Sequence, residues 1–431
     1  MSLSRRRVLR AAAGLGSLAV SSAVGACGGA DDSGAATGGE IVLWYWPGGL
    51  SDAVLADAVR EFAPRTTLKP TLIEGDFRAR LTEALAGPPG GVPSIAGIKG
   101  EEIASFLPRA DLFTDLHRVG ADEVAGQYLP WKWQQASAPD DRLIGFPIDI
   151  GPTAMFYRAD VFERAGLPVE PGEVAAELGT WNDYFEAGIT ISKALPGVKL
   201  LRNAPELFTI VICQGTKRFI DEANHFVGDG AHVRAAWDTA ARLVGTGVSA
   251  GIPVEDDARW KAGLRDGTLA TELGAAWLGY DIKTAAPDAA GDWRVASGPA
   301  SGANYGGSFL SLPVNGQDPA LAYEIVAWIL SPENQARAFA DAALFPAAPA
   351  TYTMAALREP DAYFGGQVTV EVFGDSAQRA HRVYEAPADA DVQQVYIRQL
   401  GAFENGEKTE TEAWRDAVAE GRRLAASLGV N

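Results

Sequence analysis

The sequence predicts an α/β protein of two domains, in which helices cover β-sheets. The first observation lies at the start of the folded part, where a strand pattern, a helical pattern and a second strand pattern follow one another between residues 40 and 73. That order is typical of a parallel sheet covered by helices. The second observation is the length of 431 residues, which allows two domains with ample apolar core.

The first predicted strand covers residues 40–46 and ends at Pro47-Gly48-Gly49, a sequence that favours a turn. A helix follows, with Ser51 or Asp52 as its N-cap and with apolar side chains at helical spacing. Ligands of such sheets bind at the carboxyl ends of the strands, which is where Trp46 and this turn are expected to lie.

The same patterns place further elements along the chain. Predicted strands or extended segments lie at 68–73, 143–152, 154–158, 292–296 and 305–313, with an ambiguous strand at 273–278. Predicted helices lie at 81–85, 160–167, 181–191, 233–244, 257–265, 321–330, 333–340 and 411–428. No segment beyond the N-terminal region is apolar and long enough to span a membrane.

The N-terminus predicts export and lipid attachment. Paired arginines, Arg5-Arg6, precede a short apolar run, as in a twin-arginine signal, and the run ends in Val24-Gly25-Ala26-Cys27, which is similar to a lipobox. We therefore expect residues 1–26 to be a signal peptide, Cys27 to carry the lipid, and residues 27–39 to form a flexible tether. The protein would then be anchored on the extracytoplasmic face of the cell membrane.

Two alternatives apply to this N-terminal segment. An ordinary cleaved signal is one, and the general secretory route also stays open, because Val8 stands where a twin-arginine signal usually has Phe. A membrane anchor is the other, although the uncharged run from Ala11 to Ala26 is shorter than the roughly 20 residues that span a bilayer.

The charge of the chain excludes some partners. The net charge is −18, and it becomes −22 without residues 1–26, which hold four arginines and no acid. Nucleic-acid binding needs clustered Lys and Arg, and anionic lipids repel an acidic surface, so the lipid on Cys27 must hold the protein at the membrane. With Cys27 lipidated, Cys213 is left without a disulfide partner and is predicted to be a buried small side chain.

The sequence carries no catalytic or metal-binding signature. The patterns G-x-S-x-G, H-E-x-x-H and G-x-x-x-x-G-K are absent, and the four histidines are scattered without metal-ligand spacing. We therefore expect a protein that is not an enzyme and that needs no metal and no cofactor. A pair of carboxylates acting as a glycosidase remains an alternative, because acids are plentiful.

Two series of motifs carry a resemblance to a known family. The first is Gly145-Phe146-Pro147-Ile148-Asp149, then Phe156-Tyr157-Arg158, then residues 160–167, which read Asp-Val-Phe-Glu-Arg-Ala-Gly-Leu. The second is Gly306-Gly307 before a strand that ends in Pro313, a helix with Trp328, and residues 331–335, which read Ser-Pro-Glu-Asn-Gln. In this order and spacing, the chain resembles the solute-binding lipoproteins of ABC-type sugar importers (family 1, the carbohydrate-uptake type).

The resemblance implies a periplasmic-binding-protein-like fold, in which crossover hinge strands join two α/β lobes. Lobe 1 would comprise 40–149 and 298–344, and lobe 2 would comprise 150–297 and 345–431. The chain would cross between them near Asp149 to Pro152 and again at 298–307. The implied function is to capture a mono- or oligosaccharide between the lobes, as a monomer, and to deliver it to the transmembrane subunits of an ABC permease.

Sugar chemistry selects the candidate site residues. Aromatic rings stack on the apolar faces of a pyranose, and carboxylates accept hydrogen bonds from its hydroxyls. The candidates are Trp46, Trp277, Tyr45, Tyr280 and Phe345 for stacking, Asp149, Glu74 and Asp76 for the hydroxyls, and Gly306 and Gly307 for close approach of the backbone. Each Trp could instead pack in the core, and Trp328 and Trp181 are predicted to do so.

Three other functions stay open. The same fold could bind a non-sugar solute: a polyol phosphate, although the candidate loops hold no Arg cluster, or a cationic polyamine, which would suit the acidic balance. An envelope glycan-processing enzyme and a structural lipoprotein are the alternatives from other classes.

Overall fold

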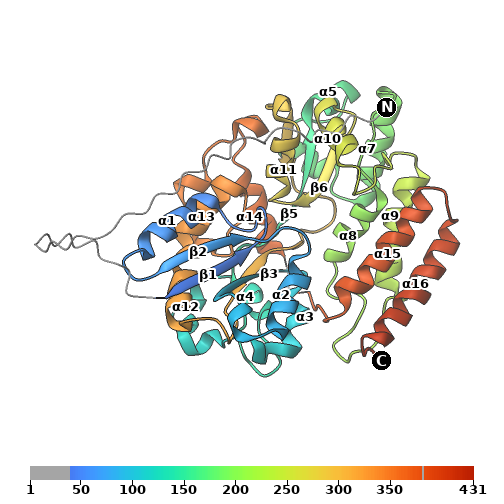
Figure 1. Cartoon of the computed structure of the whole chain (residues 1–431). Helices are drawn as coiled ribbons and strands as arrows, with labels where there is room; N and C mark the ends of the chain where they lie inside the picture. Colours follow the sequence, from blue (N-terminus) through green and yellow to red (C-terminus); the bar gives the residue numbers. More distant parts are fainter. Residues whose placement is uncertain (1–38, 381–382) are drawn as a thin grey trace, which may run out of the picture. The chain divides into compact units, whose positions relative to one another are not determined.

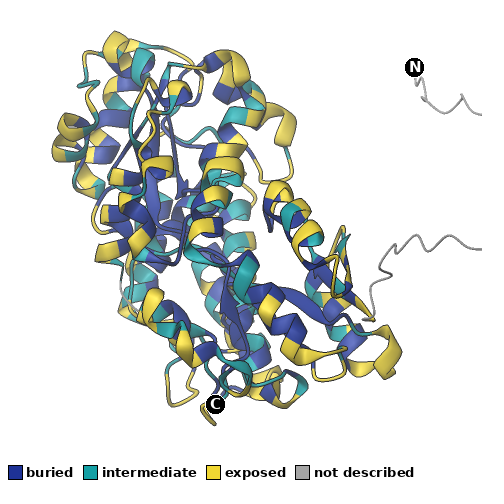
Figure 2. Cartoon of the chain, turned by 90° about the vertical axis from the view of Figure 1, so that its left-hand side faces the viewer, coloured by how far each residue is buried: buried dark blue, intermediate teal, exposed yellow. Residues whose placement is uncertain are grey.

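The computed structural model of the chain describes residues 39–380 and 383–431. The predicted signal peptide, Cys27 and the tether up to residue 38 lie outside the described residues. Two β-sheets organise the described part (Figure 1), one of five strands and one of three. Buried residues run along the strands of both sheets, whereas the outward faces of the helices are exposed (Figure 2).

The first sheet has the strand order β2-β1-β3-β8-β4. Its strands are β1 (Glu40–Tyr45), β2 (Thr67–Leu72), β3 (Ile95–Lys99), β4 (Phe146–Pro147) and β8 (Ser308–Ser311). The parallel pairing predicted from the strand–helix–strand order is confirmed for β1 with β2 and β3. β8 instead runs antiparallel to both β3 and β4, because it enters this sheet from the other one.

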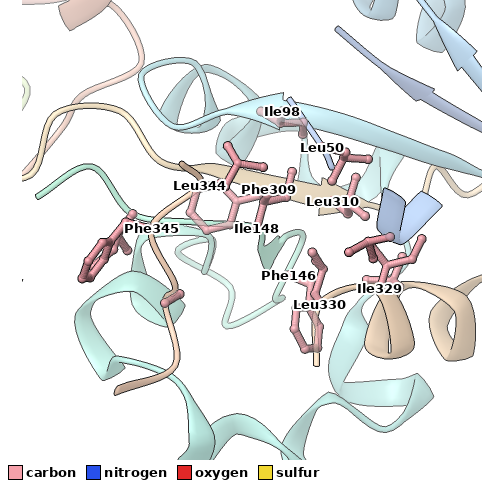
Figure 3. Close-up of a cluster of buried hydrophobic side chains, with 14 of the residues drawn as sticks. Leu50, Ile98, Phe146, Ile148, Phe309, Leu310, Ile329, Leu330, Leu344 and Phe345 are labelled. Carbon is pink, nitrogen blue, oxygen red and sulfur yellow. The ribbon is translucent and has the colours of Figure 1, made fainter. Parts of the chain in front are cut away.

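Helices cover the first sheet, and all but two of them, at residues 103–106 and 130–135, lie where the apolar spacing predicts helices. They are α1 (Asp52–Phe62), α2 (Phe77–Ala86), α3 (Ile103–Phe106), α4 (Pro130–Gln135), α12 (Pro319–Ile329) and α13 (Pro332–Ala342). Ser51 is the N-cap of α1, and its side chain accepts a hydrogen bond from the Val54 amide at 3.2 Å. Between sheet and helices lies an apolar core that includes Ile98, Phe146 and Phe309 (Figure 3).

The second sheet has the order β6-β5-β7 and is antiparallel throughout. Its strands are β5 (Thr153–Arg158), β6 (Thr271–Ala275) and β7 (Trp293–Ala296). The helices α5 (Ala159–Ala165), α6 (Pro171–Glu177), α7 (Trp181–Ala194), α10 (Asp257–Asp266), α11 (Leu278–Ala285) and α14 (Thr369–Arg379) accompany it. The ambiguous segment at 273–278 is thus the end of a strand, a turn at Trp277 and the start of a helix.

Four further helices form a layer with a core of its own (Figure 1). They are α8 (Ala204–Cys213), α9 (Ala231–Gly245), α15 (Asp389–Glu404) and α16 (Glu410–Ser427). Phe208, Trp237 and Tyr396 meet within it, and the rings of Phe208 and Tyr396 stack with centroids 6.0 Å apart. Cys213 is buried in this core, as predicted.

The segments that connect the two sheets run beside one another. Ile150 bridges Phe345, and Pro152 bridges Asn304, so the links from β4 to β5 and from β7 to β8 lie close to the chain that leaves α13. After Phe345 the chain first packs on α13 through short 3-10 turns, and it then returns to the second sheet, where the turn at Ala362–Phe364 contacts β7 and α14 contacts β5 and β7.

Candidate functional site

A cleft of about 930 Å³ lies where the first sheet, the second sheet and their connecting segments meet. Its volume is near the upper end of the roughly 300–1,000 Å³ found for small-molecule sites. The lining residues are Trp46, Pro47, Gly48, Gly49, Leu50, Asp52, Ala53, Lys99, Glu101, Asp149, Trp277, Tyr280, Asp281, Tyr305, Gly306, Gly307, Ser308, Asp341, Ala342 and Leu344. They come from six stretches of chain, which only the fold brings together.

Trp46 enters the cleft from the carboxyl end of β1, as the sequence predicts. Two glycines make room for its ring, since a Cβ at Gly49 would lie 2.7 Å from it and a Cβ at Gly97 would lie 2.5 Å from it. Phe77 contacts the ring edge to face at 5.2 Å between centroids. The Nζ atom of Lys99 lies 5.7 Å from the ring centroid. The ring is therefore held in a fixed orientation on the wall of the cleft.

Trp277 and Tyr280 reach the cleft from the start of α11, where Trp277 is the N-cap and Tyr280 lies in the first turn. The ring of Trp277 lies 5.7 Å from that of Tyr305, at an interplanar angle of 52°. Tyr280 is 50% exposed, an unusual state for a large ring. Sequence reasoning missed Tyr305, although its place directly before Gly306-Gly307 at the predicted second crossing was a usable signal.

Asp149 lines the cleft and is only 3% exposed. Its Oδ1 accepts a hydrogen bond from the Ser308 amide at 2.7 Å. Burial raises the pKa of this carboxyl, and the nearby Lys132 ammonium and the Ser308 hydrogen bond oppose that rise. A carboxylate that is almost completely desolvated and faces a cleft is a functional-site candidate.

Lys132 lies behind this wall and is completely buried. Its Nζ donates to Gln135 Oε1 at 3.0 Å and lies 3.8 Å from the centroid of the Phe309 ring. Burial lowers the pKa of Lys132, while the attraction of Asp149 works against this. Sequence reasoning missed Lys132, because nothing in the pattern of α4 marks one lysine as buried.

Gly306 and Gly307 both have positive φ, +81° and +77°. A Cβ at Gly307 would lie 2.8 Å from the Asp149 carbonyl oxygen and 3.0 Å from Lys132 Nζ. The pair is therefore needed both for its backbone conformation and for the close approach of Asp149 and Lys132. The sequence analysis expects these glycines to let the backbone approach a ligand, and that role stays a prediction.

Four candidates are not brought to the cleft, and for Phe345 the structure corrects the prediction. Phe345 is completely buried among Phe339, Tyr352 and Phe373, with centroids 5.0–5.9 Å away, so it is a core residue. Its apolar ring gains more from this core than from solvent.

The carboxylates after β2 also lie elsewhere. Asp76 is the N-cap of α2, and its Oδ1 accepts a hydrogen bond from the Ala79 amide at 3.0 Å. Glu74 is exposed, and neither it nor Asp76 lines the cleft. Tyr45 packs against the first core and does not line the cleft either. The cleft carboxylates that the sequence did not single out are Asp52, Glu101, Asp281 and Asp341.

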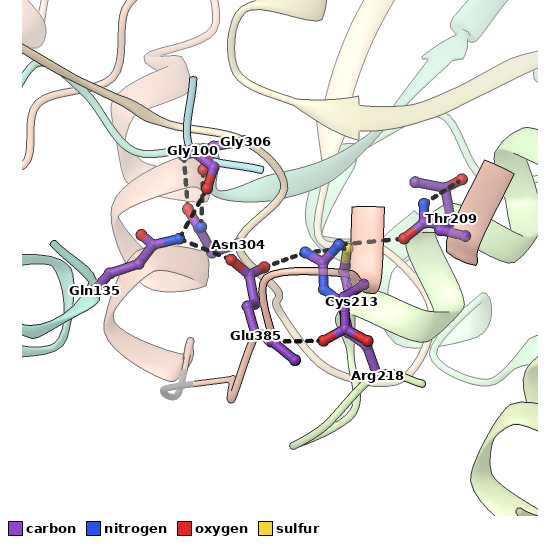
Figure 4. Close-up of polar contacts among 12 residues, drawn as sticks. Gly100, Gln135, Thr209, Cys213, Arg218, Asn304, Gly306 and Glu385 are labelled. Atoms are coloured by element: carbon purple, nitrogen blue, oxygen red, sulfur yellow. Dashed lines mark hydrogen bonds and ion pairs between the residues drawn. The ribbon is translucent and has the colours of Figure 1, made fainter. Parts of the chain in front are cut away.

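A chain of polar contacts runs beside the cleft (Figure 4). Gln135 donates to the Gly100 carbonyl at 3.4 Å and to Glu385 Oε2 at 3.1 Å. Glu385 forms an ion pair with the buried Arg218, which donates to Gln393 Oε1 at 3.2 Å. These contacts join α4, next to the first sheet, to the four-helix layer.

A second, smaller hollow borders the same contacts. Its volume is about 380 Å³, and apolar side chains such as Ile103, Leu107 and Trp131 dominate its lining, together with Gln135 and Glu385. It offers fewer groups that could orient a polar solute than the cleft does, so we place the candidate site in the cleft.

Comparison with known proteins identifies the family. The sequence model of a family described as "Bacterial extracellular solute-binding protein" matches residues 79–364, about two thirds of the chain. The chain belongs to the bacterial extracellular solute-binding proteins. Within the described residues, no helix of this solute-binding protein meets the length and apolarity that crossing a membrane requires, and no group of acids, histidines or cysteines is placed to hold a metal ion.

Individual relatives agree with this family. The solute-binding protein is 24% identical over 359 residues to the lactose-binding protein of Rhizobium radiobacter, which covers 79% of this chain and 82% of the relative. It is 27% identical over 198 residues to the arabinooligosaccharide-binding protein of Bacillus subtilis, 43% of each chain. The crystal structure of an extracellular solute-binding protein of family 1 superposes with a TM-score of 0.82 at 28% identity, over 90% of this chain and 99% of the other.

Proposed function

We propose that this solute-binding protein captures a sugar, of oligosaccharide size, and delivers it to the permease of an ABC importer. The observation that carries the proposal is the combination of four aromatic side chains and five carboxylates in one cleft of about 930 Å³. Rings stack on the C–H faces of a sugar, and carboxylates accept hydrogen bonds from its hydroxyls. Relatives named for binding lactose and an arabinooligosaccharide support it.

The roles of the site residues follow from their positions. Trp46 and Trp277 would stack on sugar rings, with Tyr280 beside them, and Asp149 would accept a hydroxyl. Gly306 and Gly307 would keep the backbone close to the solute. No bond is made or broken in this scheme, so the protein acts by binding alone.

We further propose that the two sheets belong to separate lobes, 40–149 with 298–344 and 150–297 with 345–431, which close on the solute as a monomer. Closure excludes water and favours one lobe arrangement, which the permease would recognise. A lipid on Cys27, with residues 27–39 as tether, would keep the protein near its permease.

Isothermal titration of the chain from residue 28 onward against neutral mono- to tetrasaccharides tests the proposal. We expect heat with at least one oligosaccharide, and loss of that heat in Asp149→Asn. No heat with any saccharide would contradict the assignment. Radiolabelled palmitate tests the anchor separately, because Cys27→Ser should abolish its incorporation.

A glycerol phosphate or another anionic solute is the weaker alternative. Five carboxylates and one lysine line the cleft among the described residues, so a phosphate would meet like charge there.

A further inference from the structure

We propose that the solute carries a positively charged amino group, as an amino sugar does. This inference rests on the proposed function and specifies the chemical class of its ligand. It starts from the five carboxylates of the cleft, Asp52, Glu101, Asp149, Asp281 and Asp341. Within residues 39–380 and 383–431, none of these five forms an ion pair.

The contrast with nearby acids is direct. Asp256 and Asp257, beside and on α10, pair with Arg259 and Lys261, and Asp361 pairs with Lys283. The cleft thus concentrates carboxylates that the described parts of the chain leave without a cation. A cleft lined by one sign of charge, with walls of low dielectric constant, focuses its field on what enters.

Two lysines offset part of this charge. Lys99 lines the cleft with its Nζ near the ring of Trp46, and the buried Lys132 attracts Asp149 from behind Gly307. Counted together over the described residues, five acids face two ammonium groups. The excess is negative, which favours a cationic solute and opposes a phosphate or a uronate.

Asp149 is the one buried carboxylate of these five, since the other four are exposed. It is 97% buried as a residue, yet among the described residues only Oδ1 has a hydrogen-bond partner, the Ser308 amide. Oδ2 is not one of the fully enclosed side-chain atoms without a partner in the described residues, so it is open to the cleft, where a group of the solute can replace water. Its residue lines the cleft, so an ammonium or hydroxyl of the solute is the group that would satisfy it.

The aromatic side chains suit the same ligand. An ammonium near the face of Trp or Tyr is attracted by the ring, and the attraction grows as the pair is desolvated. Trp277 and Tyr280 stand on the same turn as Asp281, so rings and a carboxylate from one element would meet the amino group together.

Matched sugars test the inference. Cellobiose, its diamino analogue (the β-1,4 dimer of glucosamine) and the N-acetylated form of that dimer share one skeleton, and lactose with lactosamine provides a second. We expect an amine to bind at least tenfold more tightly than its neutral partner at pH 6.5, with N-acetylation abolishing the gain. Higher ionic strength should reduce the gain, because salt screens the carboxylates.

Variants separate the cleft charge from net charge. Asp281→Asn should weaken binding of the amine about 3- to 10-fold more than it weakens binding of the neutral analogue. Glu177→Gln is the matched control, because Glu177 is an exposed carboxylate outside the cleft and forms no ion pair or hydrogen bond among the described residues. Circular dichroism melts of both variants check that each is folded.

The outcomes are distinct. A neutral sugar that binds as tightly as its amine overturns the inference, as does binding of any neutral saccharide with no binding of either amine. Equal losses in Asp281→Asn and Glu177→Gln also overturn it, because the effect would then reflect overall charge. If no saccharide binds at all, neutral or charged, the proposed function itself is wrong.

Discussion

Among single residues, two aromatic side chains take opposite roles according to their burial. Trp277 and Phe345 both follow short motifs rich in small residues, and both were predicted to stack on a sugar. Trp277 lines the cleft, whereas Phe345 is completely enclosed by other rings. Removing the Trp277 side chain should therefore lower sugar affinity, whereas removing the Phe345 side chain should lower stability.

Trp277→Ala should lower sugar affinity about 10- to 100-fold, or about 1.4–2.8 kcal/mol, because truncating a central aromatic contact has this cost. Its melting temperature should change little, since the ring is only partly buried. Titration calorimetry and thermal melts of the same preparation measure the two effects. A stability loss as large as the affinity loss would contradict a stacking role.

Phe345→Ala should show the reverse pattern. Emptying a fully enclosed aromatic site costs about 3–5 kcal/mol of unfolding free energy, because the cavity collapses only in part. Sugar affinity of the folded fraction should stay within about twofold of the parent protein. Urea unfolding measures the first quantity, and an unchanged unfolding midpoint would place Phe345 outside the core.

Gly307→Ala tests the close contact behind Asp149. Gly406 is the matched control, because it has a similar φ (+75° against +77°) but no heavy atom near a built Cβ. Gly406→Ala should cost about 1 kcal/mol for its left-handed backbone. Gly307→Ala should cost more and should also weaken sugar binding, because its Cβ displaces Asp149 or Lys132. Equal costs from urea unfolding would argue that the contact is unimportant.

Glu102 should make stability depend on pH. Burial raises the pKa of its carboxyl to about 7, and Glu101 adds to the rise. The folded protein then holds this proton more tightly than the unfolded chain does, so its contribution to stability is present below about pH 4.5 and is lost as the pH rises to about 7. Glu102→Gln should remove about 1–2 kcal/mol of the pH-dependent change in unfolding free energy, measured by urea unfolding. This value is reduced because the side chain is partly exposed. Parallel pH profiles of parent and variant would contradict the assignment.

At the level of helices and strands, the sequence predicts local structure better than it predicts which strands pair and which side chains meet. Apolar spacing and the Ser51 cap located α1, and the glycine after residue 165 located the end of α5. The antiparallel entry of β8 depends on a crossing between sheets, which no local pattern records. The same holds for Asp281 and Asp341, because acids on exposed helix turns look alike until the fold brings some of them to one cleft.

Gln135 on α4 donates a hydrogen bond to Glu385, which precedes α15. It joins the two proposed lobes beside the cleft, so we expect Gln135→Ala to favour an open arrangement in the absence of sugar. Small-angle X-ray scattering should then show a larger radius of gyration than for the parent. Gln134→Ala is the control, because its neighbouring exposed side chain forms no hydrogen bond among the described residues. Identical scattering of all three proteins would argue against a bridge between lobes.

Considered as a whole molecule, the protein combines a family fold with a cleft that aromatic rings and carboxylates line. The family sequence model covers residues 79–364, and a solved family member superposes over 90% of the chain, so the frame is shared. The cleft draws its lining from both sheets and from the segments between them. Its aromatic rings and its carboxylates without ion pairs are the features that would select the solute. Because these side chains come from separate segments, similarity to the family motifs identifies the family but not the ligand.

A crystal structure of the protein with its tightest-binding oligosaccharide tests this account most directly. We predict that the sugar lies in the cleft, with a ring stacked on Trp46 or Trp277 and a hydroxyl or amino group within hydrogen-bond distance of Asp149. A sugar bound in the apolar hollow beside Trp131, or on the outer surface, with the cleft unoccupied, would contradict it.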